Sequence, residues 1–258
     1  MKTLYLLCIS VLGFEFGAAP AQEIVPKLRV ERKADFPHDR QAFTQGLLVF
    51  EGKLFESTGL YGRSSLRRVD LATGRVEKKI DLPKEYFAEG LARVDRSLIQ
   101  ITWKEGKAFV WNLDTFEQTN EFTYTGEGWG LAFDGKALLM SDGSNRVTMR
   151  DPQTFEPQRT VTVLEAGQPL MQLNELEFMG GRLYANVWME DRFVRIDSGT
   201  GRVTATISAT GLLEPADRDG VDVLNGIAHD EATGKIYVTG KLWPKLFEVT
   251  LVPEVLLK

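Results

Sequence analysis

The chain has 258 residues, of which 43% are hydrophobic and 26% charged, an ordinary globular composition. With 31 lysines and arginines against 36 aspartates and glutamates, it has no basic excess for binding nucleic acid or an anionic membrane. One cysteine excludes an internal disulfide framework, a zinc ribbon and an iron–sulfur site, and two histidines leave little for a multi-histidine metal centre.

The N-terminus has the pattern of a secretory signal peptide. Lys2 supplies a positive charge, an apolar run covers 4–13, and Ala19 and Ala21 stand in the Ala-x-Ala relation that signal peptidase recognises. The run is about ten residues long, and a membrane-spanning helix needs roughly 20. We therefore expect 1–21 to be a signal peptide, and the mature protein to be periplasmic or secreted without a membrane anchor.

The rest of the chain reads as short strands separated by tight turns. Leu66–Asp70 and Arg75–Glu77 flank an Ala-Thr-Gly turn and predict a β-hairpin. Similar turns that end in Thr-Gly recur at Gly199–Gly201 and Ala232–Gly234. The pattern predicts an all-β protein.

A second signature is a polar or aromatic residue followed by Gly-Leu or a close variant. We call the residues at this position the anchor residues: Gln45, Glu89, Trp129, Asn174 and Asn225. A period of about 40–45 residues with several short strands is typical of a propeller blade. The sequence therefore predicts a five-bladed β-propeller with four-stranded blades over 22–258. We expect the segment 27–34, which has no blade of its own, to complete the last blade.

Equivalent positions in successive blades form rings around the axis of a propeller, so the anchor residues should converge at one mouth of the central channel. A second ring lies about fourteen residues further along each repeat. Its members are Gly59, Trp103, Gly143, Trp188 and, displaced by two positions, Lys241. Tryptophans and polar groups gathered in this way favour a pocket for a small, partly apolar ligand.

Glu89 is the only carboxylate among the anchor residues, and its neighbours Phe87, Ala88 and Leu91 are apolar. Burial raises the pKa of an acid and suits it to proton transfer near neutral pH. Lys241 would place a positive charge at the edge of the pocket. The two tryptophans outside the rings, Trp111 and Trp243, are predicted to lie in the core.

Several of these segments, in order and in phase, resemble the glutaminyl-peptide cyclotransferases of plants and bacteria, which are five-bladed propellers unrelated to the zinc-dependent animal enzymes. The matching segments are Phe43–Leu47, Thr58–Ser64, Tyr86–Gly90, Leu173–Glu177 and Leu224–Ala228. The resemblance implies an aminoacyltransferase that converts an N-terminal glutamine of a peptide or protein to pyroglutamate and releases ammonia. It implies no metal and no cofactor, and we expect a monomer that binds no nucleic acid.

The resemblance also assigns roles to individual residues. Glu89 would transfer the proton, and Lys241 would help to complete the site. From the chemistry of ring closure we expect Asn174 or Lys241 to donate a hydrogen bond to the oxyanion. Asn174 and Gln45 would bind polar groups of the substrate. The remaining substrate-binding side chains would be Phe43, Trp103, Trp129 and Trp188.

Two other functions remain open from the residues themselves. A calcium-dependent, lactonase-like propeller would use oxygen ligands such as Glu89, Asn174, Asn225 and Asp142. Against it, only one anchor residue is anionic and aromatic residues dominate the second ring. A non-catalytic propeller that presents its surface to protein partners would have its channel mouth blocked by packed side chains.

Cleavage after Ala21 would expose Gln22, a substrate for the implied reaction, as the new N-terminus. We expect the mature protein to carry pyroglutamate there, because a secreted cyclotransferase would modify its own N-terminus. The intact mass should then be lower than that of the unmodified chain by one ammonia. An unmodified Gln22 in protein with confirmed cleavage after Ala21 contradicts this prediction.

Overall fold

The computed structural model describes residues 24–254 of the chain, so the predicted signal peptide lies outside the described residues. Within this range the fold is all-β apart from one short 3₁₀ helix, Pro215–Asp217. No helix among the described residues has the length and apolar character needed to cross a membrane.

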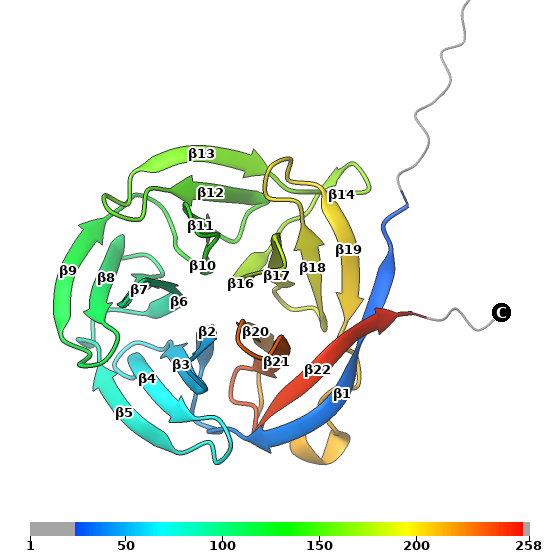
Figure 1. The fold of residues 1–258 in the computed structure, drawn as a ribbon, viewed down its shortest axis with the longest axis horizontal. Coiled ribbons are helices and arrows are strands. Elements are labelled where there is room, and N and C mark those ends of the chain that lie inside the picture. Colours follow the sequence, from blue (N-terminus) through cyan, green and yellow to red (C-terminus); the bar gives the residue numbers. More distant parts are fainter. Residues whose placement is uncertain (1–23, 255–258) are drawn as a thin grey trace, which may run out of the picture.

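Three antiparallel four-stranded sheets follow one another along the chain, each with its strands in chain order from the centre outwards (Figure 1). The strands of the first sheet are β2 (Thr44–Phe50), β3 (Lys53–Thr58), β4 (Ser65–Asp70) and β5 (Val76–Asp81). Those of the second are β6 (Ala88–Val94), β7 (Ser97–Thr102), β8 (Lys107–Asn112) and β9 (Gln118–Thr123). Those of the third are β10 (Leu131–Phe133), β11 (Leu138–Ser141), β12 (Arg146–Arg150) and β13 (Pro157–Thr162).

The remaining large sheet has eight strands in the order β16-β17-β18-β19-β1-β22-β21-β20. Their bounds are β16 (Leu173–Met179), β17 (Arg182–Val187), β18 (Arg192–Ile196), β19 (Val203–Ser208), β1 (Lys27–Pro37), β22 (Lys245–Pro253), β21 (Lys235–Gly240) and β20 (Leu224–Asp230). Strand β1 runs antiparallel to β22 and parallel to β19, which links the first described strand to the last one. A small hairpin, β14 (Leu164–Glu165) and β15 (Gln168–Pro169), lies outside this sheet.

The strands nearest the centre contact one another in the cyclic order β2, β6, β10, β16, β20 and back to β2 (Figure 1). The sheets therefore surround a common axis in a propeller-like arrangement. The all-β class that the strand and turn pattern predicts is confirmed.

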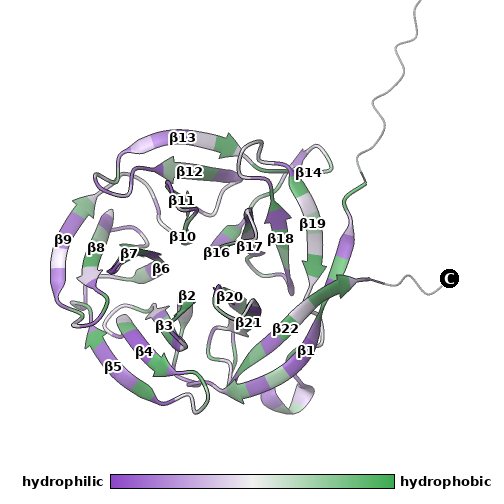
Figure 2. Ribbon diagram, viewed as in Figure 1, coloured by the Kyte–Doolittle hydropathy of each residue, from purple (hydrophilic) through white to green (hydrophobic). Residues whose placement is uncertain are grey.

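Hydrophobic side chains fill the space between neighbouring sheets. Leu66 of β4, Leu91 of β6 and Leu98 of β7 belong to one such cluster, which joins the first sheet to the second. The outer strands carry both hydrophobic and hydrophilic residues (Figure 2), and β19 alternates between buried and half-buried ones. Burial is nearly complete on inner strands such as β2 and β6, whereas the outer strands β9 and β13 are mostly exposed.

The glycine of the repeated signature is required by the close approach of the inner strands. A Cβ on Gly46 would lie 2.5 Å from the backbone nitrogen of Leu91, and one on Gly90 would lie 2.4 Å from that of Leu131. A Cβ on Gly130 would lie 2.1 Å from the carbonyl oxygen of Asn174. Each contact is with backbone of the next inner strand, which no side-chain rotation can move. The glycine thus fixes the distance between neighbouring sheets at the axis.

Replacing Gly90 with alanine should therefore destabilise the fold strongly, by about 2 kcal/mol or more, because the added methyl group forces two inner strands apart. Thermal or denaturant unfolding of Gly90→Ala measures the loss. Gly199→Ala is the matched control, since its added Cβ would meet only the flexible Asp197 side chain at 3.3 Å. Equal stability of the two variants would show that the inner strands tolerate separation.

Candidate active site

The anchor residues occupy the beginnings of the inner strands. Gln45, Glu89, Asn174 and Asn225 are each the second residue of their strand, β2, β6, β16 and β20, and Trp129 lies two residues before β10. Because the inner strands surround one axis, these residues lie at the same mouth of the central channel. Apart from Trp129, which is half-buried, they are all buried.

Hydrogen bonds connect three of the buried side chains. The Nδ2 of Asn225 donates to Oε1 of Gln45 at 3.2 Å, and Nε2 of Gln45 donates to Oε1 of Glu89 at 2.8 Å. The second carboxyl oxygen of Glu89, Oε2, is buried and has no hydrogen-bond partner. The carboxyl group is therefore held in place through one oxygen and leaves the other free to exchange a proton.

Burial gives Glu89 a pKa well above the usual range of a glutamate, since the side chain is only 4% exposed. The positive charge of Lys241 opposes this shift, and the carboxylates of Glu105 and Glu127 add to it. The ammonium group of Lys241 is itself buried, which lowers its pKa, and its Nζ lies 4.8 Å from the centre of the Phe43 ring. The mouth thus combines an acid of raised pKa with a buried cation.

Aromatic rings form two groups at this mouth. Phe87 contacts Phe43 with 6.2 Å between ring centres and Trp103 with 5.6 Å. Trp129 and Trp188 meet edge to face at 5.6 Å with an interplanar angle of 89°. All the predicted aromatic site residues therefore lie in one of these two groups.

The carboxylate of Glu127 joins the two groups. Its Oε2 accepts a hydrogen bond from Nε1 of Trp103 at 2.8 Å and from Nε1 of Trp129 at 2.9 Å. The residue comes from the segment between β9 and β10. One carboxylate oxygen thus binds indole groups that two neighbouring sheets contribute.

Lys241 occupies the position of the second ring although its spacing differs by two residues. Its backbone N–H donates to the carbonyl oxygen of Val223 at 2.9 Å, just as that of Trp103 donates to Phe87 at 2.9 Å. The additional residues lie in the turn 231–234 between β20 and β21, which is two residues longer than the turn between β6 and β7. The longer turn accommodates the two additional residues, so Lys241 still occupies the position equivalent to Trp103.

The glycines of the second ring make room for aromatic rings. A Cβ on Gly59 would lie 2.4 Å from the ring of Phe87, and one on Gly143 would lie 2.5 Å from that of Trp129. The tryptophans outside the rings, Trp111 and Trp243, are buried in hydrophobic clusters, as the sequence predicts.

Two residues of the mouth were not identified from the sequence. The sequence marks Phe87 only as an apolar neighbour of Glu89, and it gives Glu127 no distinguishing signature. Both lie two positions before an anchor residue, the same phase as Phe43. Extending the comparison of repeats by two residues would have found them.

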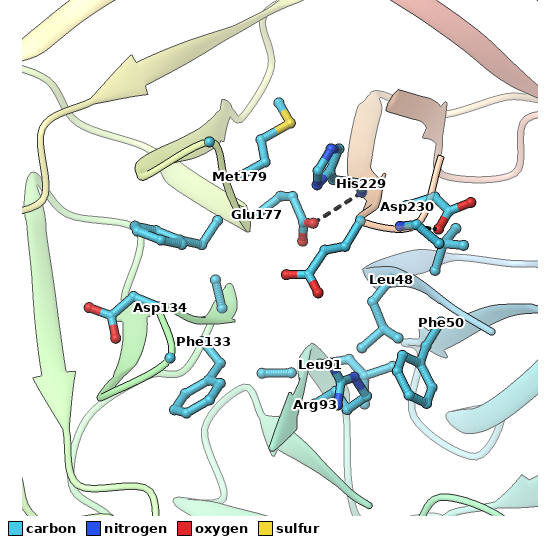
Figure 3. A pocket seen from close by; sticks show the side chains of 18 of the residues that line it. Leu48, Phe50, Leu91, Arg93, Phe133, Asp134, Glu177, Met179, His229 and Asp230 are labelled. Carbon is cyan, nitrogen blue, oxygen red and sulfur yellow. Dashed lines mark hydrogen bonds between the residues drawn. The ribbon is translucent and has the colours of Figure 1, made fainter. Parts of the chain in front are cut away.

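The opposite mouth of the channel holds a cavity of about 690 Å³ (Figure 3). Its lining comes from the last residues of the inner strands, among them Leu48, Leu91, Ala132, Glu177 and His229. The backbone N–H of His229 donates to Oε1 of Glu177 at 3.0 Å. None of the predicted site residues lines this cavity.

The lactonase alternative requires side-chain oxygens that bind a calcium ion. Both carboxylate oxygens of Asp142 already accept hydrogen bonds. The Oδ2 accepts one from the guanidinium of Arg146 at 3.0 Å, and the Oδ1 accepts one from the backbone N–H of Ser144 at 3.0 Å. Among residues 24–254 there is no group of three or more histidine, cysteine, aspartate and glutamate side chains arranged to hold a metal ion.

These features define a propeller-like, all-β protein with a buried acid and an aromatic lining at one channel mouth. The family model for glutamine cyclotransferase matches residues 5–251, and the chain belongs to that family. A glutaminyl-peptide cyclotransferase of Arabidopsis thaliana is 44% identical over 228 residues, which cover 86% of this chain and 71% of the relative. The crystal structure of Myxococcus xanthus glutaminyl cyclase, 37% identical, matches with a TM-score of 0.84 over 90% of this chain and 100% of that one.

A second buried glutamate gives the protein a pH-dependent stability. Glu175 follows the anchor residue Asn174, where the other anchor residues are followed by glycine. Its Oε2 accepts a hydrogen bond from the backbone N–H of Ile227 at 2.9 Å. Burial raises the pKa of Glu175 to about 8. The folded state therefore retains a proton that the unfolded state releases above its ordinary pKa of 4.5. Stability should fall as the pH rises from that value to about 8, by up to about 1.4 kcal/mol per unit.

The Glu175→Gln variant cannot ionise, so its free energy of unfolding should fall less steeply over the same range. Denaturant unfolding at a series of pH values measures both slopes. Identical slopes for the variant and the natural protein would mean that Glu175 does not carry this proton.

Proposed function

We propose that this protein is a glutaminyl-peptide cyclotransferase that converts the N-terminal glutamine of peptides or proteins to pyroglutamate. The observation that carries the proposal is the carboxyl group of Glu89, which is buried, raised in pKa and free at one oxygen beside an aromatic lining. Membership of the glutamine cyclotransferase family supports the same reaction. In class, the activity is that of an aminoacyltransferase.

The reaction joins two groups of one residue. The α-amine of the substrate attacks its own γ-carboxamide carbon, so ring closure benefits from intramolecular proximity. Glu89 accepts a proton from the attacking nitrogen and delivers it to the amide nitrogen. The bond between that nitrogen and the carbonyl carbon then breaks, and ammonia leaves. A pKa near the working pH suits a group that must both accept and donate the proton.

Polar side chains around Glu89 hold the substrate and the developing charge. Gln45, whose amide nitrogen is 2.8 Å from Oε1 of Glu89, orients the carboxyl group and binds the substrate carboxamide. Asn174 and Lys241 donate hydrogen bonds to the oxyanion that forms when the amine attacks. In a site with little water such donors stabilise charge far more than they do in solution.

The aromatic residues hold the folded glutamine and exclude water. Trp103, Trp129 and Trp188 are half-buried and line the approach to the buried Glu89. Their faces attract the positively charged α-ammonium before it loses its proton. Phe43 completes the wall next to Lys241, 4.8 Å from its Nζ. Glu89 relays a proton that the substrate amine itself provides, and the side chains of this chain donate every hydrogen bond in the proposed mechanism, with no metal or cofactor.

We extend the proposal to the whole protein. The innermost strands would each begin one blade of a five-bladed β-propeller, and β1 would complete the last blade beside β22. A signal peptide over 1–21 would direct the mature domain, 22–258, to the periplasm or the exterior. There it would act as a monomer on peptides or proteins with N-terminal glutamine.

Replacing Glu89 with glutamine should lower kcat by about 10²–10⁴-fold, because the variant keeps the shape but cannot take up the proton. Ammonia release from a glutaminyl dipeptide measures the activity, with and without a chelator. The natural protein should be equally active in both conditions.

Asp142→Asn is the control that separates this reaction from a calcium-dependent one. It should retain full activity, since its carboxylate is bound to Arg146 and Ser144. Activity of Glu89→Gln near that of the natural protein, or loss of activity with chelator, contradicts the proposed mechanism.

A further inference from the structure

The carboxylate of Glu127 is bound to two tryptophans of the candidate site. Both indole N–H groups, from Trp103 at 2.8 Å and from Trp129 at 2.9 Å, converge on the same oxygen, Oε2. The other oxygen, Oε1, lies 3.8 Å from Nζ of Lys104, whose ammonium group stands 3.7 Å from the centre of the Trp103 ring. Hydrogen bonds to an ionised acceptor are stronger than those between neutral groups.

The backbone on either side fixes the position of this carboxylate. The N–H of Gly128 donates to the carbonyl oxygen of Trp103 at 2.8 Å. A Cβ on Gly128 would lie 2.4 Å from the hydroxyl of Tyr124 and 2.8 Å from the carbonyl oxygen of Thr102. The segment that carries Glu127 and Trp129 is therefore packed directly against the end of β7, which Trp103 follows.

We propose that Glu127 is a positioning residue whose carboxylate fixes the relative orientation of Trp103 and Trp129 and thereby holds the aromatic wall in its substrate-binding form. Trp103 directly follows β7 of the second sheet and Trp129 precedes β10 of the third, so the wall crosses the boundary between two sheets. An indole without its acceptor can turn about its side-chain bonds. The proposal rests on the function proposed above.

The charge of Glu127 has a second effect at the same mouth. Together with Glu105 it raises the pKa of Glu89, while Lys241 lowers it. Removal of the negative charge should lower the pKa of Glu89 and move the acidic limb of the activity profile to lower pH. Orientation of the tryptophans and the charge at Glu89 are thus two separable contributions of one residue.

Two substitutions separate these contributions. Glu127→Ala removes both the acceptor and the charge, whereas Glu127→Gln removes the charge but keeps one oxygen that can accept both indole N–H groups. Glu117→Ala, at an exposed glutamate in the turn between β8 and β9, is the matched control. The measurements are KM, kcat and their pH dependence with a glutaminyl dipeptide, together with the melting temperature.

We expect Glu127→Ala to raise KM by at least about tenfold, the effect of losing hydrogen bonds to a charged acceptor, with a smaller change in kcat. Glu127→Gln should restore KM to within about threefold of the natural value, since a neutral acceptor retains much of the bond. The acidic limb of the activity profile should move to lower pH in both Glu127 variants. In Glu117→Ala, KM and the position of the acidic limb should both stay as in the natural protein.

Other results overturn the proposal. An unchanged KM in Glu127→Ala shows that the tryptophans do not need the carboxylate. A KM raised equally in both variants, or an acidic limb that stays in place, also contradicts it. These outcomes presuppose a natural protein that releases ammonia from the dipeptide; absence of that activity contradicts the proposed function instead.

Discussion

The structure depends on the close contact of its inner strands around one axis. At three of the five anchors, a Cβ on the glycine would lie 2.1 to 2.5 Å from backbone of the next inner strand, so only hydrogen fits there. This constraint explains why Gly-Leu recurs along the chain. Because the contact is made at the same point of each repeat, the residue just before each glycine reaches the same mouth. Residues at the same position of successive repeats are thereby brought close together in space.

The proposed chemistry follows from that convergence. Glu89 is placed among side chains from other sheets, where burial raises its pKa and only Lys241 among the nearby charges opposes the shift. Gln45 fixes one of its oxygens and leaves the other free. The neighbouring repeats supply aromatic rings at the same level. Each repeat thus contributes one or two side chains, and none contains a site by itself.

Much of this arrangement could be predicted from the sequence because the repeat itself encodes it. The all-β class follows from the pattern of short strands and tight turns, and the shared location of Gln45, Glu89 and Asn174 follows from the spacing of the anchors. The place of Lys241 was less evident, since a turn longer by two residues is visible only when strand pairing is known. The role of Glu127 depends on hydrogen bonds between two sheets, which no local pattern reports. The cavity at the opposite mouth depends on side-chain packing and was likewise not predictable.

A crystal structure of the Glu89→Gln variant with a glutaminyl dipeptide tests the central claim most directly. We expect the α-amine and the carboxamide of the peptide to lie beside residue 89, with the glutamine side chain against Trp103, Trp129 and Trp188. Occupancy of the opposite cavity near Glu177 and His229, with the mouth at residue 89 closed to the peptide, would contradict the account.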